Sequence, residues 1–398
     1  MAQICLKLLN SNYPTKMATL IINAGSVTIK YKLFDDKLQL LLSGMIDNKN
    51  GRYVSEISKD GQEYSWDISK EQFVNSANLI LNECQGYKIE KVGFRIVHGG
   101  EKFKQPTLLD NNVLKELEAL NTLAPLHNPP ALKKIREFRD LITDIPFYGV
   151  FDTAFHSKMP PKAYMYALPY EYYQMYSIRR YGFHGISHSF IISELNKLEP
   201  EAKKIISCHL GGGASIAAIM DHNSIDTSMG FTPLEGLIMA TRAGDVDDGA
   251  VYYLQEITHF NDDEFNEIQN KKSGLLGISG YTADMRTLLQ DEAAGNERAH
   301  LAIEMYVYRI QKYIASYIGA LNGVDAVTIT AGVGAGSDII RKRIFEGLGY
   351  FNLRVDPKIN DGRINVAENL RISAFGSCPI WIIPTNEELE IARQIQNL

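Results

Sequence analysis

Two stretches of the chain repeat one pattern, a strand, a glycine turn and a second strand, and this repeat constrains the fold more than any other feature. In the first copy, Thr19–Phe34 contains two apolar strands that meet at Gly25. In the second, Lys204–Leu210 leads to Gly211 and then to a strand over Ile216–Met220. A pattern that occurs twice in this form predicts two copies of one design within the chain.

The remaining periodicity places helices between strands. A third apolar strand over Ala326–Ala331 enters the glycine turn Gly332–Gly336, and a helix is expected over Asp338–Phe345. Apolar residues at helical spacing also predict helices over Asn112–Leu120 and Glu297–Leu321. Strands mixed with helices on this rhythm predict an α/β protein with layered sheets.

A chain of 398 residues is long enough for two or three domains, each with its own core. We expect an N-terminal extension over residues 1–16, a first domain over 17–160 and a second domain over 161–384, with the boundary near Pro160-Pro161. The last segment has a buried-looking strand and then a Thr-Asn capping signal before a helix at about 385–398. We expect this helix to pack back on the first domain.

Composition excludes several classes of function. The 41 Lys and Arg against 47 Asp and Glu give a net charge of −6, which argues against binding to nucleic acid. We find no run of 18 apolar residues, so a membrane partner is not expected. Cysteines 5, 84, 208 and 378 lie far apart without a CxxC pair, as is typical of free thiols in a reducing compartment. The sequence therefore predicts a cytoplasmic protein.

The glycine turns that follow apolar strands suit a polyphosphate, because backbone N–H groups can approach anionic oxygens only where side chains are small. Any one of them alone is more often a plain turn. The GxxxxGK[ST] motif is absent, and Gly332–Gly336 does not match the dinucleotide fingerprint. Phosphate binding of some other kind is therefore expected.

Two arginines and two carboxylates are candidates for chemistry on phosphate. Arg95 ends a strand just before paired glycines, and Arg242 lies in a polar loop; both suit a transferring phosphoryl group, although an internal ion pair is the alternative for each. Asp152 directly follows an apolar strand and can serve magnesium-bound water, orient an arginine or cap a helix. Glu387 can contribute to a metal site or only interact with a helix dipole.

The histidines allow several roles. His184 and His188 have the spacing of two zinc ligands on a helix, but no HExxH glutamate follows and glycines interrupt the segment, so zinc is disfavoured. His184, beside glycines, can instead donate to a developing negative oxygen. His127 lies in a loop bounded by prolines, where a core or capping histidine is the commoner case.

Taken together, these segments resemble the acetate kinase (acetokinase) family, of the acetate and sugar kinase/Hsp70/actin superfamily, over residues 17–398. The motifs, in the order of the family, are IINAGSVTIKYKLF, FRIVHGGEKF, APLHNPPAL, FDTAFH, RRYGFHGISH, HLGGGASI, DTSMGFTPLEGLIMATRAGDVD, SGLLGISG with ADMR, TAGVGAGS and IPTNEELEIAR. The resemblance implies two duplicated ribonuclease-H-like (actin-like ATPase) domains around a central cleft, and a homodimer. It also implies reversible transfer of the ATP γ-phosphoryl group to acetate, giving acetyl phosphate and ADP, with Mg²⁺ as cofactor, for which Mn²⁺ can substitute.

The resemblance also assigns roles at the matching positions. The catalytic residues are Arg95, Asp152, His184 and Arg242, with His127 in support. The acetate pocket comprises Arg95, Val97, Leu126, Phe183 and Pro233. Magnesium is organised by Asn23 and Glu387 together with Asp152. The nucleotide is bound by Ser26, Thr28, Lys30, His209, Gly211, Gly212, Gly213, Asp284, Met285, Arg286, Gly332, Val333, Gly334 and Ala335.

The chain departs from the family at the nucleotide turns. Gly212 stands where the family usually has Asn, and Gly334–Ser337 reads Gly-Ala-Gly-Ser where the family has Gly-Glu-Asn-Ser. Two alternatives stay open on these grounds, a pyrophosphate-dependent acetate kinase and a related propionate or butyrate kinase. A non-catalytic actin-like module is disfavoured, because both arginines, both carboxylates and His184 are present.

Overall fold

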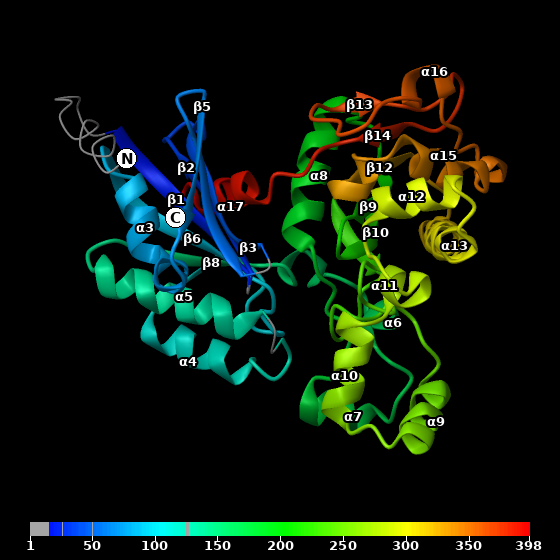
Figure 1. Ribbon diagram of the computed structural model, residues 1–398, viewed down its shortest axis with the longest axis horizontal. Coiled ribbons are helices and arrows are strands. Elements are labelled where there is room, and N and C mark those ends of the chain that lie inside the picture. Colours follow the sequence, from blue (N-terminus) through cyan, green and yellow to red (C-terminus); the bar gives the residue numbers. More distant parts are fainter. Residues whose placement is uncertain (1–15, 26, 50, 125–126) are drawn as a thin grey trace. The chain divides into compact units, whose positions relative to one another are not determined.

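The computed structural model describes residues 16–25, 27–49, 51–124 and 127–398 (Figure 1). These residues form two compact units. Unit 1 contains the described residues up to Ala154 together with Asn386–Leu398, and unit 2 is Phe155–Thr385. Apart from Lys16, with which the first strand begins, the expected extension lies outside the described residues.

Unit 1 is built on a mixed sheet whose eight described strands have the order β5-β4-β3-β2-β1-β6-β8-β7. The strands are β1 (Lys16–Ala24), β2 (Thr28–Phe34), β3 (Leu40–Lys49), β4 (Arg52–Lys59), β5 (Gln62–Ile68), β6 (Tyr87–Ile96), β7 (Thr107–Leu108) and β8 (Phe147–Phe151). Strands β1, β6 and β8 run parallel, whereas β2 and β3 continue the sheet antiparallel from β1. The expected hairpin at Gly25 is therefore the β1–β2 turn.

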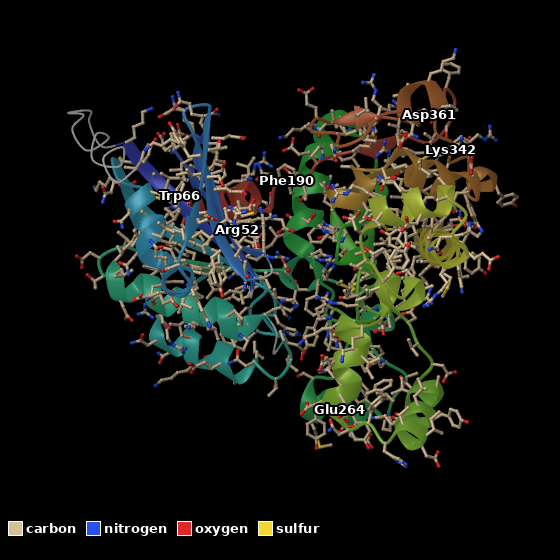
Figure 2. The ribbon with its side chains drawn as sticks, in the orientation of Figure 1. Arg52, Trp66, Phe190, Glu264, Lys342 and Asp361 are labelled. Atoms are coloured by element: carbon tan, nitrogen blue, oxygen red, sulfur yellow. The ribbon has the colours of Figure 1, made fainter. Side chains whose placement is uncertain are left out.

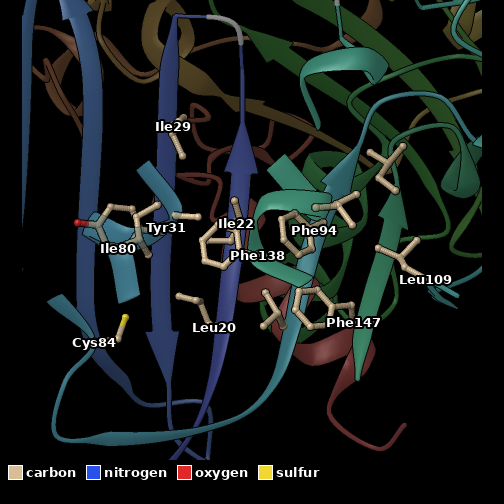
Figure 3. Close-up of a cluster of buried hydrophobic side chains, with 14 of the residues drawn as sticks. Leu20, Ile22, Ile29, Tyr31, Ile80, Cys84, Phe94, Leu109, Phe138 and Phe147 are labelled. Atoms are coloured by element: carbon tan, nitrogen blue, oxygen red, sulfur yellow. The ribbon is translucent and has the colours of Figure 1, made fainter. Parts of the chain in front are cut away.

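Helices cover both faces of this sheet. They are α2 (Lys70–Val74), α3 (Ser76–Glu83), α4 (Asn111–Ala119), α5 (Asn128–Leu141) and α17 (Glu387–Ile395). Leu20 and Ile22 of β1 belong to the core that includes residues of α3 and α5 (Figure 3), and Phe94 stacks on Phe147 and meets Phe138 edge-on. Alternate residues point to the opposite face, where Ile21 lies against α17.

Unit 2 repeats this plan. Its six described strands have the order β11-β10-β9-β12-β14-β13. They are β9 (Lys204–Leu210), β10 (Ala214–Met220), β11 (Asn223–Thr227), β12 (Ala326–Thr330), β13 (Leu370–Arg371) and β14 (Ile380–Ile382). Here β9, β12 and β14 are parallel and β10 and β11 antiparallel, so β11-β10-β9-β12-β14 has the order and sense of β3-β2-β1-β6-β8. The predicted duplicated α/β fold is confirmed.

The helices of unit 2 include the long α13, which runs from Glu297 to Leu321 as the periodicity predicts. The others are α6 (Pro161–Tyr164), α7 (Tyr170–Tyr176), α8 (Gly185–Leu198), α9 (Asp248–Thr258), α10 (Asp262–Lys271), α11 (Gly274–Ser279), α12 (Met285–Ala293), α14 (Ala331–Gly334), α15 (Asp338–Glu346) and α16 (Pro357–Asn360). Helices α8 and α13 both pack on the sheet of β9 and β10, and Figure 2 shows Phe190 on α8. No helix of the described residues is long and apolar enough to cross a membrane.

The segment after β12 differs from expectation. The glycine turn expected at Gly332–Gly336 takes the form of one helical turn over Ala331–Gly334, α14. A Cβ at Gly334 would lie 2.5 Å from Ile329 Cγ2, and one at Gly336 would lie 2.1 Å from the Gly332 carbonyl oxygen. The glycines therefore permit a close backbone fold rather than an extended loop.

Helix α17 belongs to unit 1 although it is the last helix of the chain. Asn386 caps it by accepting a hydrogen bond from the Leu389 N–H at 3.2 Å. The helix lies against β6 at Gly93, where a Cβ would lie within 2.8–2.9 Å of Ile21, Ile391 and Ile395. A glycine on β6 thus permits the close approach of α17.

We predict that Gly93→Ala destabilises the protein by roughly 1–3 kcal/mol, because the added methyl overpacks the contact between β6 and α17. The matched control is Gly319→Ala in α13, where the Cβ meets no atom within 4 Å and alanine favours the helix. Thermal unfolding followed by circular dichroism measures both. Equal unfolding midpoints for the two variants would contradict the close packing of α17.

Candidate active site

Arg95, at the end of β6, is the centre of a buried ionic cluster in unit 1. Its Nη2 donates to Asp152 Oδ2 at 2.7 Å, and its Nη1 lies 3.1 Å from Glu387 Oε2. The Asp152 side chain is only 1% exposed. Burial alone would lower the pKa of Arg95, but the carboxylates of Asp152 and Glu387 outweigh it and raise that pKa above its ordinary value. The guanidinium is therefore held as a fixed cation.

The cluster extends through a second glutamate that the sequence did not single out. Glu388 pairs with Lys32 at 3.1 Å, and the Asn23 amide lies 3.3 Å from both Glu387 Oε2 and Glu388 Oε1. Burial opposes ionisation of Glu388, but Lys32 and Asn23 overcome it and lower its pKa. The sequence feature that could have indicated Glu388 is the pair of adjacent acids in the first turn of α17. Its pairing with Lys32 could not be predicted, because Lys32 lies on β2, far away in sequence.

The loop after β6 is fixed by residues that were also missed. Asn128 is fully buried; its Oδ1 accepts from the His98 N–H at 3.1 Å and its Nδ2 donates to the His98 carbonyl at 3.0 Å. Thr153 Oγ1 accepts from the Gly99 N–H at 3.1 Å. The Asn128 bonds tie the loop that follows Arg95 to the start of α5, and the Thr153 bond ties it to the residue that follows Asp152. His127 occupies the cap position of α5, but its side chain makes no capping hydrogen bond there.

At the β1–β2 hairpin, the Gly25 N–H donates to the Thr28 carbonyl at 2.9 Å. The Thr28 hydroxyl donates to Asp47 at 2.7 Å, and Lys30 is exposed. Ser26 and Leu126, expected in the phosphate hairpin and the acetate pocket, lie outside the described residues. Val97 lies in the loop just after Arg95 and is half-buried.

In unit 2, His184 and Arg242 lie together beside the turn Gly211–Gly213. A Cβ at Gly213 would lie 3.3 Å from His184 Nε2 and 3.6 Å from Arg242 Nη1, so the glycine keeps the space between these groups open. The His184 ring stacks on His209, with centroids 4.2 Å apart. Its backbone is left-handed, with φ of 56°, and α8 starts at the next residue.

Arg242 and Pro233 are neighbours, since Arg242 Nη1 donates to the Pro233 carbonyl at 3.4 Å. Burial lowers the pKa of Arg242 from its ordinary value. The Ala240 N–H donates to the Gly212 carbonyl at 3.0 Å and so ties this loop to the glycine turn. Phe183, also expected in the acetate pocket, is 1% exposed. Arg242, Pro233, His184 and the glycine turn therefore form one group.

The other segments that were expected to bind the nucleotide lie at the ends of helices α12 and α14. Asp284 caps α12, accepting from the Arg286 N–H at 2.8 Å, and pairs with the Arg286 side chain, which lowers its pKa to about 2. Met285 is buried beside them. Next to Gly332, Val333 and Gly334, the fully buried Arg341 donates to the carbonyls of Gly334 at 2.9 Å and Ala335 at 3.2 Å. Arg341 was missed, because only the fold shows that it holds the α14 turn.

Both units thus present polar groups where parallel strands end, on sheets of matching order, which is the duplicated arrangement of the actin-like ATPase fold. The sequence model of the Acetokinase family matches residues 18–393, and the chain belongs to that family. It is 44% identical to the acetate kinase of Fervidobacterium nodosum over 96% of this chain and 98% of the relative.

Solved structures agree. An acetate kinase from Porphyromonas gingivalis superposes with a TM-score of 0.86 at 36% identity, covering 95% of this chain and 98% of that one. A propionate kinase from Francisella tularensis superposes with a TM-score of 0.89 at 35% identity, covering 96% of this chain and 100% of that one. The family resemblance and the fold class are confirmed.

We predict that His156, which supports Phe183 in unit 2, stays neutral well below pH 6. It is fully buried, its Nε2 donates to the Phe183 carbonyl at 3.0 Å, and burial lowers its pKa from 6.5 to about 4. Between these values the unfolded chain binds more protons than the folded one, so stability falls as pH decreases from 6.5 towards 4, by on the order of 3 kcal/mol. A ¹⁵N NMR titration of the histidines measures it, and half-protonation near pH 6.5 would disprove the prediction.

Proposed function

We propose that this protein transfers the γ-phosphoryl group of ATP to the carboxylate of acetate, forming acetyl phosphate and ADP reversibly. The observation that carries the proposal is the Arg95 guanidinium, held by Asp152 and Glu387 at the end of β6. The relatives named as acetate kinases support the choice of acceptor.

Phosphoryl transfer to a carboxylate requires the protein mainly to position the reactants and to stabilise the negative charge of the transferring group. A carboxylate is already a nucleophile, so no general base is required and transfer proceeds directly in line. The forked donors of Arg95 and Arg242 match the oxygens of a phosphoryl group or an acetate carboxylate. His184 donates from Nε2 to the charge that develops during transfer, with His127 in support. The family resemblance assigns the methyl group of acetate to Val97, Leu126, Phe183 and Pro233.

The oxygen donors in unit 1 fit a magnesium ion that is completed by nucleotide phosphates and water. Among the described residues, no group of three or more His, Cys, Asp or Glu side chains could hold a metal ion alone. That is the usual situation for Mg²⁺, which takes one or two protein carboxylates and keeps several waters. Asn23 and Glu387 would hold it, with Asp152 in support, and the ion, or Mn²⁺ in its place, would neutralise phosphate charge.

We place the nucleotide on unit 2. The turn at Gly211–Gly213 with His209, the α14 turn at Gly332–Ala335 and the Asp284–Arg286 segment would bind it. The family resemblance also assigns Ser26, Thr28 and Lys30 to nucleotide binding. A cytoplasmic location stays a prediction from the sequence.

The first test is substitution of the two arginines. We expect Arg95→Ala and Arg242→Ala each to lower acetyl phosphate formation on the order of a thousandfold, because each removes charge stabilisation of the transferring group. Arg95→Lys keeps the charge but loses the fork and should also be severely impaired.

The matched control is Arg52→Ala. Arg52 is exposed and pairs with Asp67 on the surface of unit 1 (Figure 2), so its loss should leave the rate unchanged. Trapping acetyl phosphate with hydroxylamine gives the rates, and acetate is compared with propionate. If either alanine variant of Arg95 or Arg242 kept more than roughly a tenth of the wild-type rate, its assigned role would be wrong.

The donor is tested separately. Gly212 and Ala335 leave backbone donors in place but lack the polar side chains usual at these turns, and each lost hydrogen bond weakens binding by only about 0.5–1.5 kcal/mol. We therefore expect ATP and GTP both to serve. Acetyl phosphate formation is compared at equal concentrations of ATP, GTP and pyrophosphate with Mg²⁺. Activity with pyrophosphate alone would refute the nucleotide assignment.

We further propose a homodimer in which helices α7 and α9 of unit 2 meet a second copy. Figure 1 draws both helices at the same end of that unit. Their exposed apolar side chains are Tyr170, Tyr172, Met175 and Tyr176 on α7 and Tyr252, Tyr253, Leu254 and Ile257 on α9. Clusters of exposed aromatics of this kind mark interaction surfaces.

We expect Tyr253→Glu with Ile257→Glu to convert the dimer to a monomer, because the new charges would be buried in the interface. The control, Ile364→Glu, changes a residue of unit 2 that is 61% exposed and should leave the mass unchanged. Size-exclusion chromatography with light scattering gives the mass of each. A wild-type monomer, or a dimer that survives the double change, would overturn this surface.

A further inference from the structure

A row of hydrogen-bonded hydroxyl and imidazole groups, from Ser207 through His188 and Ser215, ends at Nδ1 of His184. Ser207 Oγ lies 2.8 Å from His188 Nδ1, His188 Nε2 lies 2.9 Å from Ser215 Oγ, and Ser215 Oγ lies 3.0 Å from His184 Nδ1. Ser207, His188 and Ser215 are completely buried between α8 and strands β9 and β10. The row is sealed from water and ends on the ring to which the proposed function gives a catalytic role.

The number of protons along this row is limited. The Ser215 hydroxyl has one proton, so between two imidazoles it donates to one and accepts from the other. His188 is neutral, because burial, with His156 and His209 facing its ring, lowers its pKa well below 6.5. One of its nitrogens therefore donates and the other accepts.

Two proton orders satisfy these limits. In the first, Ser207 donates to His188 Nδ1, His188 Nε2 donates to Ser215, and Ser215 donates to His184 Nδ1. In the second, every bond is reversed and the Ser207 proton needs another acceptor. Among the described residues, the one side-chain hydrogen bond of Ser207 is that to His188. A buried hydroxyl proton without an acceptor costs about 1–3 kcal/mol, which favours the first order.

We propose that Ser215 is a positioning residue which, with His188, keeps His184 in the tautomer that has its proton on Nε2. This is the nitrogen that faces Gly213 and lies beside Arg242. The inference rests on the proposed function for its catalytic meaning, since Nε2 of a neutral His184 can donate to a phosphoryl oxygen only when it carries the ring proton. Stacking on His209 fixes the plane of the ring, and Ser215 fixes its proton.

Removal of the hydroxyl should change turnover more than binding. In Ser215→Ala, His184 Nδ1 loses its donor and the other tautomer becomes populated. We expect kcat to fall by about ten- to a hundredfold, approaching the loss that follows removal of an oxyanion donor, while the KM values for acetate and ATP change by less than about threefold. The matched control is Ser224→Ala, which removes an equally buried serine that bonds His156 at 2.8 Å; it should retain the wild-type kcat.

The decisive measurement does not depend on activity. Full-length protein labelled with ¹⁵N-histidine is compared with His184→Asn to assign the His184 signals, and the ¹⁵N shifts give the tautomer. We expect a bare Nδ1 and a protonated Nε2 in the wild type, and a mixture in Ser215→Ala. A wild-type Nδ1 that is protonated on a neutral ring would overturn the proposal, as would an unchanged tautomer and kcat in Ser215→Ala.

The wild-type spectrum decides the proton order even if Ser215→Ala does not fold. If the wild-type protein forms no acetyl phosphate, the proposed function fails. The ¹⁵N measurement then still decides which nitrogen of His184 carries the proton. His188→Gln provides a second variant, because its amide N–H can replace the donor to Ser215. It should keep more of kcat than His188→Leu, and equal losses would contradict the role of His188.

Discussion

The buried ion pair between Arg95 and Asp152 is the interaction on which unit 1 depends. A guanidinium taken out of water is costly unless carboxylates and hydrogen bonds satisfy it. Asp152 alone leaves Nη1 to be matched, and Glu387 supplies that match from the last helix of the chain. Helix α17, which carries Glu387, packs on β6 of the first unit, and Gly93 opens the space in which it lies.

The duplicated sheet explains why these groups meet. In unit 1, Arg95 ends β6, Asp152 follows β8 and Asn23 lies near the end of β1, and these three strands are parallel. Carboxyl ends of parallel strands meet at one edge of a sheet, which is where α/β proteins bind ligands. In unit 2, the glycine turn follows β9, α14 follows β12 and Thr385 follows β14 in the same arrangement. One topology therefore builds two polar edges.

The features that depend on local sequence pattern could be predicted from the sequence. The side-chain pairings between distant parts of the chain could not. Glycine turns and periodicity predicted the β1–β2 hairpin and helix α13, and Arg95 and Asp152 stood out because charges rarely end apolar strands. Lys32 looked like an ordinary strand residue, and Ser215 fell between the glycine turn and the strand expected from Ile216. Their roles come from α17 and α8, which pack on them from elsewhere in the chain. The sequence predicted a glycine turn after β12 but not its helical form, because its glycines serve close packing, which the pattern alone does not reveal.

The two units hold their functional groups by opposite electrostatic means. In unit 1 buried carboxylates raise the pKa of Arg95, so its charge is fixed. In unit 2 the groups behind His184 are neutral hydroxyls and imidazoles, and burial keeps His156 and His188 uncharged. A neutral layer adds no charge beside Arg242, whose own pKa is already lowered by burial. This unit therefore prepares His184 as a hydrogen-bond donor by orienting protons and not by adding charge. A further cation beside the buried Arg242 guanidinium would be destabilised by like-charge repulsion.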